Sequence, residues 1–173
     1  MEYYTANGVF SLVPKDIYTK NNGEKILRDQ FNLNKEAIIK SLEIPDFNAF
    51  LVYSDNHISD SNIQVKPLII ALISILKDSK SYNKVIIHYS HEQEIAQLII
   101  CTWNKLELIT SFKSDSFDTA IYYLLLSLKK LQINHHQTSL RICNKVTKDQ
   151  MDFLNNFFRK VTLVDLSKDI KIV

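Results

Sequence analysis

The chain has 173 residues, of which 46% are apolar and 23% are charged, and its formal net charge is +2. These shares are those of a globular protein and exclude a collagen, a coiled coil or a disordered chain, and the length suits one domain or two small lobes. Glycine is scarce, since only Gly8 and Gly23 are present. Most phosphate-binding loops are therefore excluded, because they need glycine to bring backbone N–H groups close to a phosphate.

Strands and helices alternate irregularly in the first part of the chain. A strand is predicted over 9–13, where Pro14 ends it and opens a short helical turn. The polar residues 21–23 predict a break before a helix over 24–31. Asn34 is expected to cap a second short helix that carries Leu42 on its apolar side.

A buried strand is then predicted over 47–53, followed by a turn at 54–56 and a polar loop at 59–62. Proline favours the start of a helix, and the helix over 67–78 is apolar almost all round. We therefore expect this helix to lie between two layers rather than on a surface. The polar residues 79–81 mark the clearest boundary in the chain.

After this boundary the order is strand, strand, strand, helix, strand, helix, strand. The strands are expected over 84–89, 95–102, 106–112, 138–143 and 161–164. The helices are expected over 117–131 and from 148 to about 160.

Capping signals support both helices. Asp115 is expected to cap the first, with Asp118 in the first turn, where the helix dipole favours a carboxylate. The run 147–150 fits a capping box at the start of the second helix. The basic pairs 129–130 and 159–160 are expected to close the two helices at their negative ends.

This order of elements predicts a mixed five-stranded sheet. Three strands joined by tight turns form an antiparallel meander, and strands reached through helical crossovers lie parallel to a neighbour. The order is that of the ribonuclease H-like fold, which actin-like ATPases carry twice; the topology alone implies no function. The predicted organisation is a partial N-terminal α/β lobe over 1–80 and a ribonuclease H-like C-terminal lobe over 81–173.

Two segments carry a family resemblance. The run 112–125 has a Phe ending the third strand, an Asp before the helix and then Tyr-Tyr-Leu-Leu, and 10–14 reads Phe-Ser-Leu-Val-Pro. Both resemble recurring pieces of a bacterial family catalogued as domain of unknown function 3822, and the similarity spans about residues 8 to 166. The resemblance implies an actin-like ATPase fold. Members of that family begin with a further stretch of strands, so it also implies a shortened first lobe here.

The residues that serve ATPases and nucleases on this fold are replaced. The turn after the first strand of the second lobe, 89–93, has neither glycine nor the Asp that would organise Mg²⁺. Asn144 stands where nucleotide-binding relatives use glycine; it can adopt the left-handed conformation, so the turn is expected to survive without the binding surface. His88 and Arg141 stand where nucleases place metal-binding carboxylates. We expect no hydrolysis, no cofactor and no metal.

Histidine and tyrosine side chains are further candidates for a site. His88 and His91 flank the turn and could face one another. The pattern favours ordinary loop histidines, or histidines whose hydrogen bonds are already made within the protein. With Asn144 they are the candidates for lining a cleft between the lobes. Tyr122 and Tyr123 read mainly as core residues with one hydroxyl in water.

Trp103 and the histidine pair 135–136 are two further candidates for binding. Trp103 sits at a hairpin tip, where edge packing is expected; exposed there, it would anchor a partner. With Tyr122 and Tyr123 it forms the candidate interaction surface. The pair 135–136 is expected to lie in a polar loop rather than to bind a metal.

Net charge, cysteine content and the absence of a secretory signal limit the partners and the compartment that we expect. Lys and Arg are spread along the chain, so nucleic acid is not an expected partner. The longest apolar stretch, 68–76, would span about 13 Å as a helix, far short of a bilayer core of about 30 Å. No secretory signal precedes it, so we expect a soluble cytoplasmic protein without membrane contact. Cys101 and Cys143 are expected to be buried free thiols, with a disulfide between them left open.

The favoured hypothesis is a non-enzymatic interaction or scaffold module on a degenerate actin-like ATPase frame. Its partner would be another protein or a second copy of itself. The alternative is a binder of a small molecule or nucleotide in the cleft between the lobes, without hydrolysis. An enzyme with unrecognised chemistry comes third.

Overall fold

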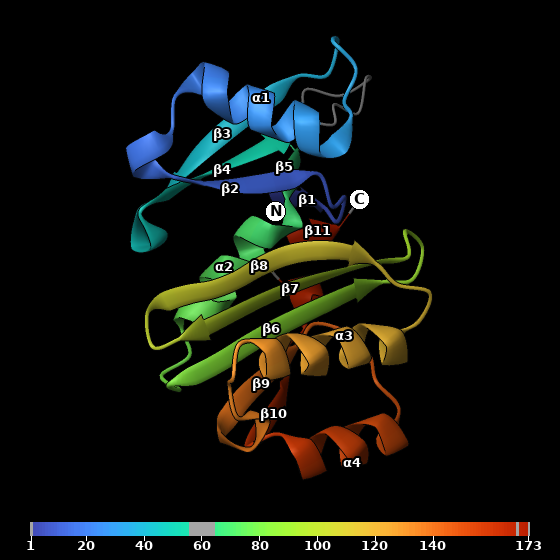
Figure 1. Ribbon diagram of the computed structural model, residues 1–173. Coiled ribbons are helices and arrows are strands. Elements are labelled where there is room, and N and C mark those ends of the chain that lie inside the picture. The colour runs from blue at the N-terminus through green and yellow to red at the C-terminus, as the bar shows by residue number, and fades with distance from the viewer. Residues whose placement is uncertain (1, 56–64, 169, 173) are drawn as a thin grey trace.

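The computed structural model describes residues 2–55, 65–168 and 170–172, whose elements stack in layers (Figure 1). The strands are β1 (Glu2–Thr5), β2 (Phe10–Pro14), β3 (Ile39–Ile44), β4 (Ala49–Ser54), β5 (Val65–Pro67), β6 (Asn83–Ser90), β7 (Ile95–Thr102), β8 (Lys105–Lys113), β9 (Thr138–Ile142), β10 (Lys160–Leu163) and β11 (Ile170–Ile172). The helices are α1 (Lys20–Phe31), α2 (Leu68–Lys77), α3 (Phe117–Lys130) and α4 (Lys148–Phe157). Short 3-10 turns are η1 (Lys15–Ile17), η2 (Pro45–Phe47), η3 (His135–Gln137) and η4 (Leu166–Lys168).

The five-stranded sheet confirms the order predicted for the second half of the chain. Its strands run β10-β9-β6-β7-β8, with β6, β7 and β8 antiparallel and with β9 and β10 parallel to β6. Side chains alternate along each strand, so Val85, Ile87 and Leu98 face one side and Ile86 and Ile99 the other. The first side packs against α3 and α4 in one apolar cluster.

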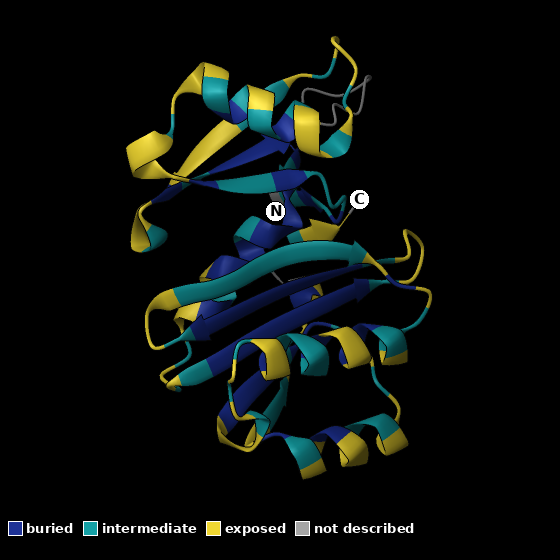
Figure 2. Ribbon diagram, in the orientation of Figure 1, coloured by how far each residue is buried: buried dark blue, intermediate teal, exposed yellow. Residues whose placement is uncertain are grey.

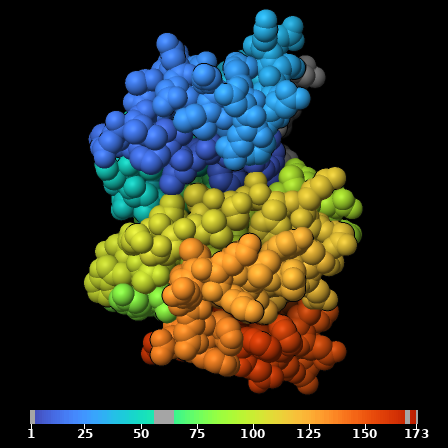
Figure 3. Space-filling view, in the orientation of Figure 1, coloured from blue at the N-terminus to red at the C-terminus, as the bar shows by residue number. Residues whose placement is uncertain are grey.

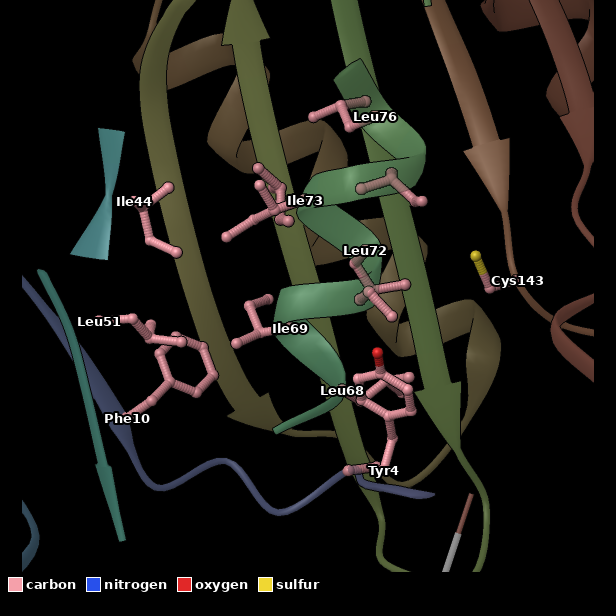
Figure 4. Packing of buried hydrophobic residues seen from close by; sticks show 14 of the residues in the cluster. Tyr4, Phe10, Ile44, Leu51, Leu68, Ile69, Leu72, Ile73, Leu76 and Cys143 are labelled. Carbon is pink, nitrogen blue, oxygen red and sulfur yellow. The ribbon is translucent and has the colours of Figure 1, made fainter. Parts of the chain in front are cut away.

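Helix α2 covers the opposite side of this sheet and confirms the prediction of a helix between two layers. Leu68, Ile69 and Leu72 are fully buried, and Leu76 is 2% exposed. They share one cluster with residues of the five-stranded sheet and of the N-terminal strands (Figure 4). Figure 2 shows the same layer as a buried band through the middle of the molecule.

The N-terminal strands β2, β4 and β3 form an antiparallel sheet with α1 lying on it (Figure 1). The helix predicted to follow Asn34 is wrong, because residues 39–44, including Leu42, form the strand β3. Residues 39–44 pair with β4 through the tight turn η2, and this pairing overrides the local helical pattern.

Helix α1 begins earlier than predicted, because the polar run 21–23 lies inside it rather than forming a break. Thr19 caps it, since its hydroxyl accepts a hydrogen bond from the Asn22 N–H. Gly23 lies where the helix meets Tyr18: a Cβ there would be 2.8 Å from the tyrosine ring.

A small parallel sheet, β11-β1-β5, was not predicted, and it brings both ends of the described chain together. Its strands have only three or four residues, too few to show periodicity. The turn predicted at 54–56 extends beyond the described residues, and the loop predicted at 59–62 lies wholly outside them.

The two cysteines, Cys101 and Cys143, are buried and free, as expected, and no disulfide joins them. Burial raises the pKa of Cys101 to about 11 and that of Cys143 to about 12. In the part of the chain that the structure describes, no helix combines the length and the apolar composition needed to cross a membrane.

Candidate functional site

Helix α3 is set in place by a serine at its start. The Ser116 hydroxyl accepts a hydrogen bond from the Thr119 N–H, so Ser116 is the N-cap and the prediction of Asp115 as the cap is wrong by one residue. A hydrogen bond from the Thr119 side chain lowers the pKa of the Asp115 carboxyl. Asp118 lies in the first turn and Lys129–Lys130 in the last turn, as predicted.

Helix α4 lies on the same side of the sheet as α3 (Figure 1), and the orange-to-red C-terminal part of the chain forms one end of the molecule (Figure 3). The predicted capping box is present: Thr147 and Gln150 exchange side-chain and backbone hydrogen bonds. The Gln150 Nε2 also donates a 2.8 Å hydrogen bond to the Asp118 Oδ1. The first turns of the two helices are therefore fastened together at the same end, so the helices run in the same direction.

A groove of about 450 Å³ lies between the two helices. Residues of α3 spaced four apart form one wall and residues of α4 spaced four apart form the other, as helix geometry requires. The lining residues are Phe117, Asp118, Ile121, Tyr122, Leu125, Asp149, Gln150, Phe153 and Leu154. We call this the α3–α4 groove.

Large aromatic side chains at the groove are exposed to water: Tyr122 and Phe153 line it, and Tyr123 lies against Tyr122. Tyr122 is 62% exposed, Phe153 46% and Tyr123 42%, so the expectation that both tyrosines belong to the core is wrong. The Tyr122 and Tyr123 rings meet edge to face at 5.5 Å, and the Phe153 ring lies 4.6 Å from that of Phe157. Aromatic rings in contact hold each other in position, which suits a preformed docking surface.

Phe153 was not singled out from the sequence, although a signal for it exists. The apolar stripe of α4 is carried by Met151, Leu154, Phe157 and Phe158, and Phe153 lies beside that stripe rather than on it. An aromatic residue off the buried stripe of an amphipathic helix has no core to fill. Such a residue is a sequence signal for a surface contact.

The charge at the groove is negative. Asp118 and Asp149 line it, and no lysine or arginine does so among the described residues. Both carboxylates belong to first helical turns, so the acidic rim lies at the end where Gln150 joins the helices.

Trp103 lies at a different place, in the turn between β7 and β8, where its backbone is left-handed with φ of 57°. It is 62% exposed, and its ring lies 6.1 Å from that of Tyr82. The structure therefore does not join Trp103 with Tyr122 and Tyr123 into one surface.

The three residues proposed for an inter-lobe cleft do not form a site together. His88 is 5% exposed on the α2 side of the sheet, while His91 is exposed in the turn and contacts Tyr89, which faces the other side. The two histidines therefore do not face one another. Burial lowers the pKa of His88 to about 4, and its Nδ1 has no hydrogen-bond partner among the described residues.

Asn144 has a structural task. Its Oδ1 accepts a 2.7 Å hydrogen bond from the Tyr89 N–H, and its Nδ2 donates to the Tyr89 carbonyl. The side chain thus continues the pairing of β6 with β9 past the end of the strand. Its φ is not positive, so the left-handed conformation considered for it is not adopted.

The turn after β6 keeps its tight shape without glycine. Glu94 is the residue with a positive φ, at 50°, and the Ser90 hydroxyl accepts a 3.4 Å hydrogen bond from the Gln93 N–H. Every residue of this turn carries a Cβ, which limits how closely a phosphate approaches the backbone.

No cluster of three or more metal-binding side chains occurs in the described part of the chain. The neighbouring His135 and His136 lie in η3, not in an open loop, and the His135 Nδ1 is 2.9 Å from the Phe157 carbonyl oxygen. This contact fastens the end of α4 to the turn before β9.

Comparison with known proteins identifies a family and a fold. The model of a family described as "Protein of unknown function (DUF3822)" matches residues 4–161. A crystal structure of a Bacteroides thetaiotaomicron VPI-5482 protein, described as having an actin-like ATPase fold and unknown function, superimposes with a TM-score of 0.76. Identity is 16%, and the match covers 93% of this chain and 66% of that one. No curated protein matches the chain.

Proposed function

The chain belongs to the DUF3822 family of unknown function, and we propose that it is a non-enzymatic interaction module on a degenerate actin-like ATPase frame. Its docking site is the α3–α4 groove. The occupant is an amphipathic helix of another protein, with basic residues near one end. The observation that carries the proposal is the pair of exposed aromatic walls, Tyr122 on α3 and Phe153 on α4.

The shape of the groove favours a helix. Two helices that run side by side on a sheet leave between them a channel in which a third helix packs its ridges. The walls repeat every four residues, as in Ile121 and Leu125, which matches the spacing of apolar residues on one face of a partner helix. An extended strand would find no free sheet edge here, because α3 and α4 satisfy their own backbone hydrogen bonds.

The exposed aromatic side chains supply the free energy of binding. Burying a large apolar side chain is worth roughly 1.5–3 kcal/mol, and Tyr122 and Phe153 still have much of their surface to bury. Aromatic residues are also the commonest anchors at the centre of protein interfaces. Two such anchors on opposite walls favour a partner that contacts both helices at once.

The acidic rim specifies the partner further. Asp118 and Asp149 would attract lysine or arginine at the end of the partner helix that meets the first turns of α3 and α4. Rim charges of this kind mostly steer association and choose orientation, so they select a basic partner without dominating affinity.

The turn after β6 supports the absence of ATPase activity. It lacks glycine. Asn144 lies near the position used for adenosine binding in the actin-like frame, and its side-chain amide is hydrogen-bonded to the backbone of Tyr89. His88 lies in the core rather than on a cleft wall. These features favour a docking module over a nucleotide-hydrolysing enzyme or a binder that uses the inter-lobe cleft.

The test of the docking site compares three full-length proteins as bait in an extract of the source cells. These are the wild type, the double variant Tyr122→Ser with Phe153→Ser, and a control double variant, Ile38→Ser with Leu42→Ser. The control removes two exposed apolar side chains from the N-terminal lobe. We expect a protein that wild type and control retain and that the groove variant loses at least tenfold. A photocrosslinker at position 153 should join a basic amphipathic segment of it.

Two results would contradict this assignment. If the groove variant retains the same proteins as wild type, the groove is not the docking site. If light scattering shows a dimer that only the groove variant disrupts, the occupant is a second copy and not another protein. Catalysis is tested separately: phosphate release from Mg-ATP should not exceed the rate without protein, and sustained turnover would overturn the non-enzymatic part.

A further inference from the structure

A second hollow, of about 590 Å³, lies on the side of the five-stranded sheet that carries α2. Helix α2 packs mainly over β6 and β7, and the hollow lies beside it over the same side of β9 and β10. The hollow lies at the beginnings of β6, β9 and β10 and includes the link between α2 and β6. An actin-like ATPase would hold its nucleotide at the turn after β6. The hollow lies at the opposite end of the sheet.

The strand register explains why this surface is polar. In the parallel pairing of β9 with β10, Lys160 lies beside Ser139 and Thr162 beside Arg141. These four side chains alternate with Leu140 and its neighbours, which point into the core shared with α3 and α4. One face of the two strands is therefore apolar and buried, and the other presents hydroxyl and cationic groups.

The hollow gathers more positive than negative side chains. Lys80, Arg141, Arg159 and Lys160 line it, and none of them forms an ion pair in the described part of the chain. Asp78 is the one acidic residue of the lining. The pair 159–160 was predicted to close α4, but α4 ends at Phe157 and Lys160 begins β10. The ammonium group of Lys160 therefore lies on this face of the sheet and not at the end of the helix.

Hydrogen-bond donors complete the site. The Ser81 and Ser139 hydroxyl oxygens are 2.8 Å apart, so the two side chains are held together at the base. Arg141 donates to the Ile75 carbonyl at the end of α2, which fixes the guanidinium while leaving it further N–H groups. Tyr82 stands at the rim, 60% exposed.

We propose that this hollow binds a small phosphate-bearing molecule, in which the phosphate lies among Arg141, Arg159 and Lys160. Guanidinium and ammonium groups with nearby hydroxyls are the donors that proteins use for phosphate. The exposed ring of Tyr82 suits a ligand whose phosphate is attached to a planar ring, as in a nucleotide. The volume lies in the range of small-ligand pockets, roughly 300–1,000 Å³. A hollow of this size favours a small ligand over a nucleic acid strand, which needs a long basic track.

The test is calorimetric titration of the full-length protein in low salt with EDTA, using inorganic phosphate, pyrophosphate, AMP and ATP as separate probes. We expect saturable binding at one site for at least one probe, weakened by added salt. Similar affinities for pyrophosphate and ATP would identify the phosphate alone as the ligand feature. Tighter binding of the nucleotides, lost in Tyr82→Ser, would identify the ring as well.

A matched pair of variants locates the site. The double variant Arg159→Ser with Lys160→Ser should weaken binding at least tenfold. The control, Lys129→Ser with Lys130→Ser, removes the same charge from the end of α3 and should stay within twofold of wild type. The proposal is overturned if none of the four probes saturates the wild type, or if both variants lose affinity equally. It is also overturned if a single-stranded 12-mer oligonucleotide binds tenfold more tightly than ATP.

Discussion

The side-chain amide of Gln150 joins the carboxylate of Asp118 by a 2.8 Å hydrogen bond, and this contact fixes α4 against α3. Gln150 also belongs to the capping box of α4, so the residue that starts one helix holds the first turn of the other. The bond joins the two walls of the α3–α4 groove at the end where both helices begin. A docking surface that is set in advance loses less entropy when a partner binds.

The bond between Asp118 and Gln150 should contribute modestly to stability. Replacement of Asp118 by Ala removes an exposed hydrogen bond and a carboxylate in the first turn of α3. We expect the free energy of unfolding to fall by about 0.5–1.5 kcal/mol. Urea unfolding followed by circular dichroism measures this change.

Two further variants separate the causes. Asp118→Asn keeps an acceptor oxygen and should lose less than Ala does. Asp152→Ala removes a carboxylate exposed elsewhere on α4 and should be nearly neutral. Equal losses in all three variants would mean that general surface charge, not this bond, sets the effect.

His88 should make the protein sensitive to acid. Burial lowers its pKa from 6.5 to about 4, so between these values the unfolded chain binds a proton that the folded protein does not. Stability is then fully present above pH 6.5 and falls as the pH drops toward 4. The loss attributable to His88 should reach roughly 2–3 kcal/mol at pH 4.5.

The measurement is urea unfolding at pH 7.5 and pH 4.5 for wild type, His88→Gln and His91→Gln. The first variant should flatten the pH dependence, whatever it does to stability at pH 7.5. The second removes an exposed histidine and should retain the loss in acid. If His88→Gln shows the same pH dependence as wild type, protonation of His88 does not govern the effect.

The two thiols should resist modification in the folded protein. Burial raises the pKa of Cys101 to about 11 and that of Cys143 to about 12, so at pH 8 about one in a thousand Cys101 thiols or fewer is ionised. We expect Ellman's reagent to react with neither cysteine over minutes at pH 8. Both should react at once in 8 M urea, and fast labelling without urea would contradict the burial.

Local patterns were enough to predict the second half of the fold. Alternation, tight turns and a capping box locate β6 to β10 with α3 and α4, because each of these elements carries its own signal. The segment of β3 was wrongly predicted as a helix, because it carries no such signal of its own. Its pairing with β4 decides its structure, and the local sequence pattern does not contain that pairing. The strands of the small parallel sheet were too short to detect.

The candidate sites were harder to predict from the sequence, because each combines residues that are distant along the chain. Tyr122 was noted, but its position opposite Phe153 depends on how α3 and α4 pack. Likewise, Lys80 and Lys160 line the same hollow only because the link after α2 lies near the start of β10. Sequence patterns consider residues one by one and took both tyrosines mainly as core residues, whereas a site is defined by the arrangement of its residues in space.

Gly23 tests the contact between α1 and the sheet beneath it. Glycine inside a helix is usually improved by alanine, by about 1 kcal/mol. Here an added Cβ would lie 2.8 Å from the Tyr18 ring and 3.1 Å from Val52. The Tyr18 ring is held in place by stacking on Phe50 at 3.8 Å and by a 2.6 Å hydrogen bond from its hydroxyl to Ser41. We therefore expect the clash to outweigh the helix propensity.

The expected result for Gly23→Ala is a net loss of roughly 1–2 kcal/mol in the free energy of unfolding. The matched background is Tyr18→Ala, which removes the ring that the new methyl group would meet. In that background Gly23→Ala should be neutral or stabilising, because only the weaker contact with Val52 remains. If Gly23→Ala stabilises the otherwise wild-type protein, α1 does not pack on Tyr18 as closely as described.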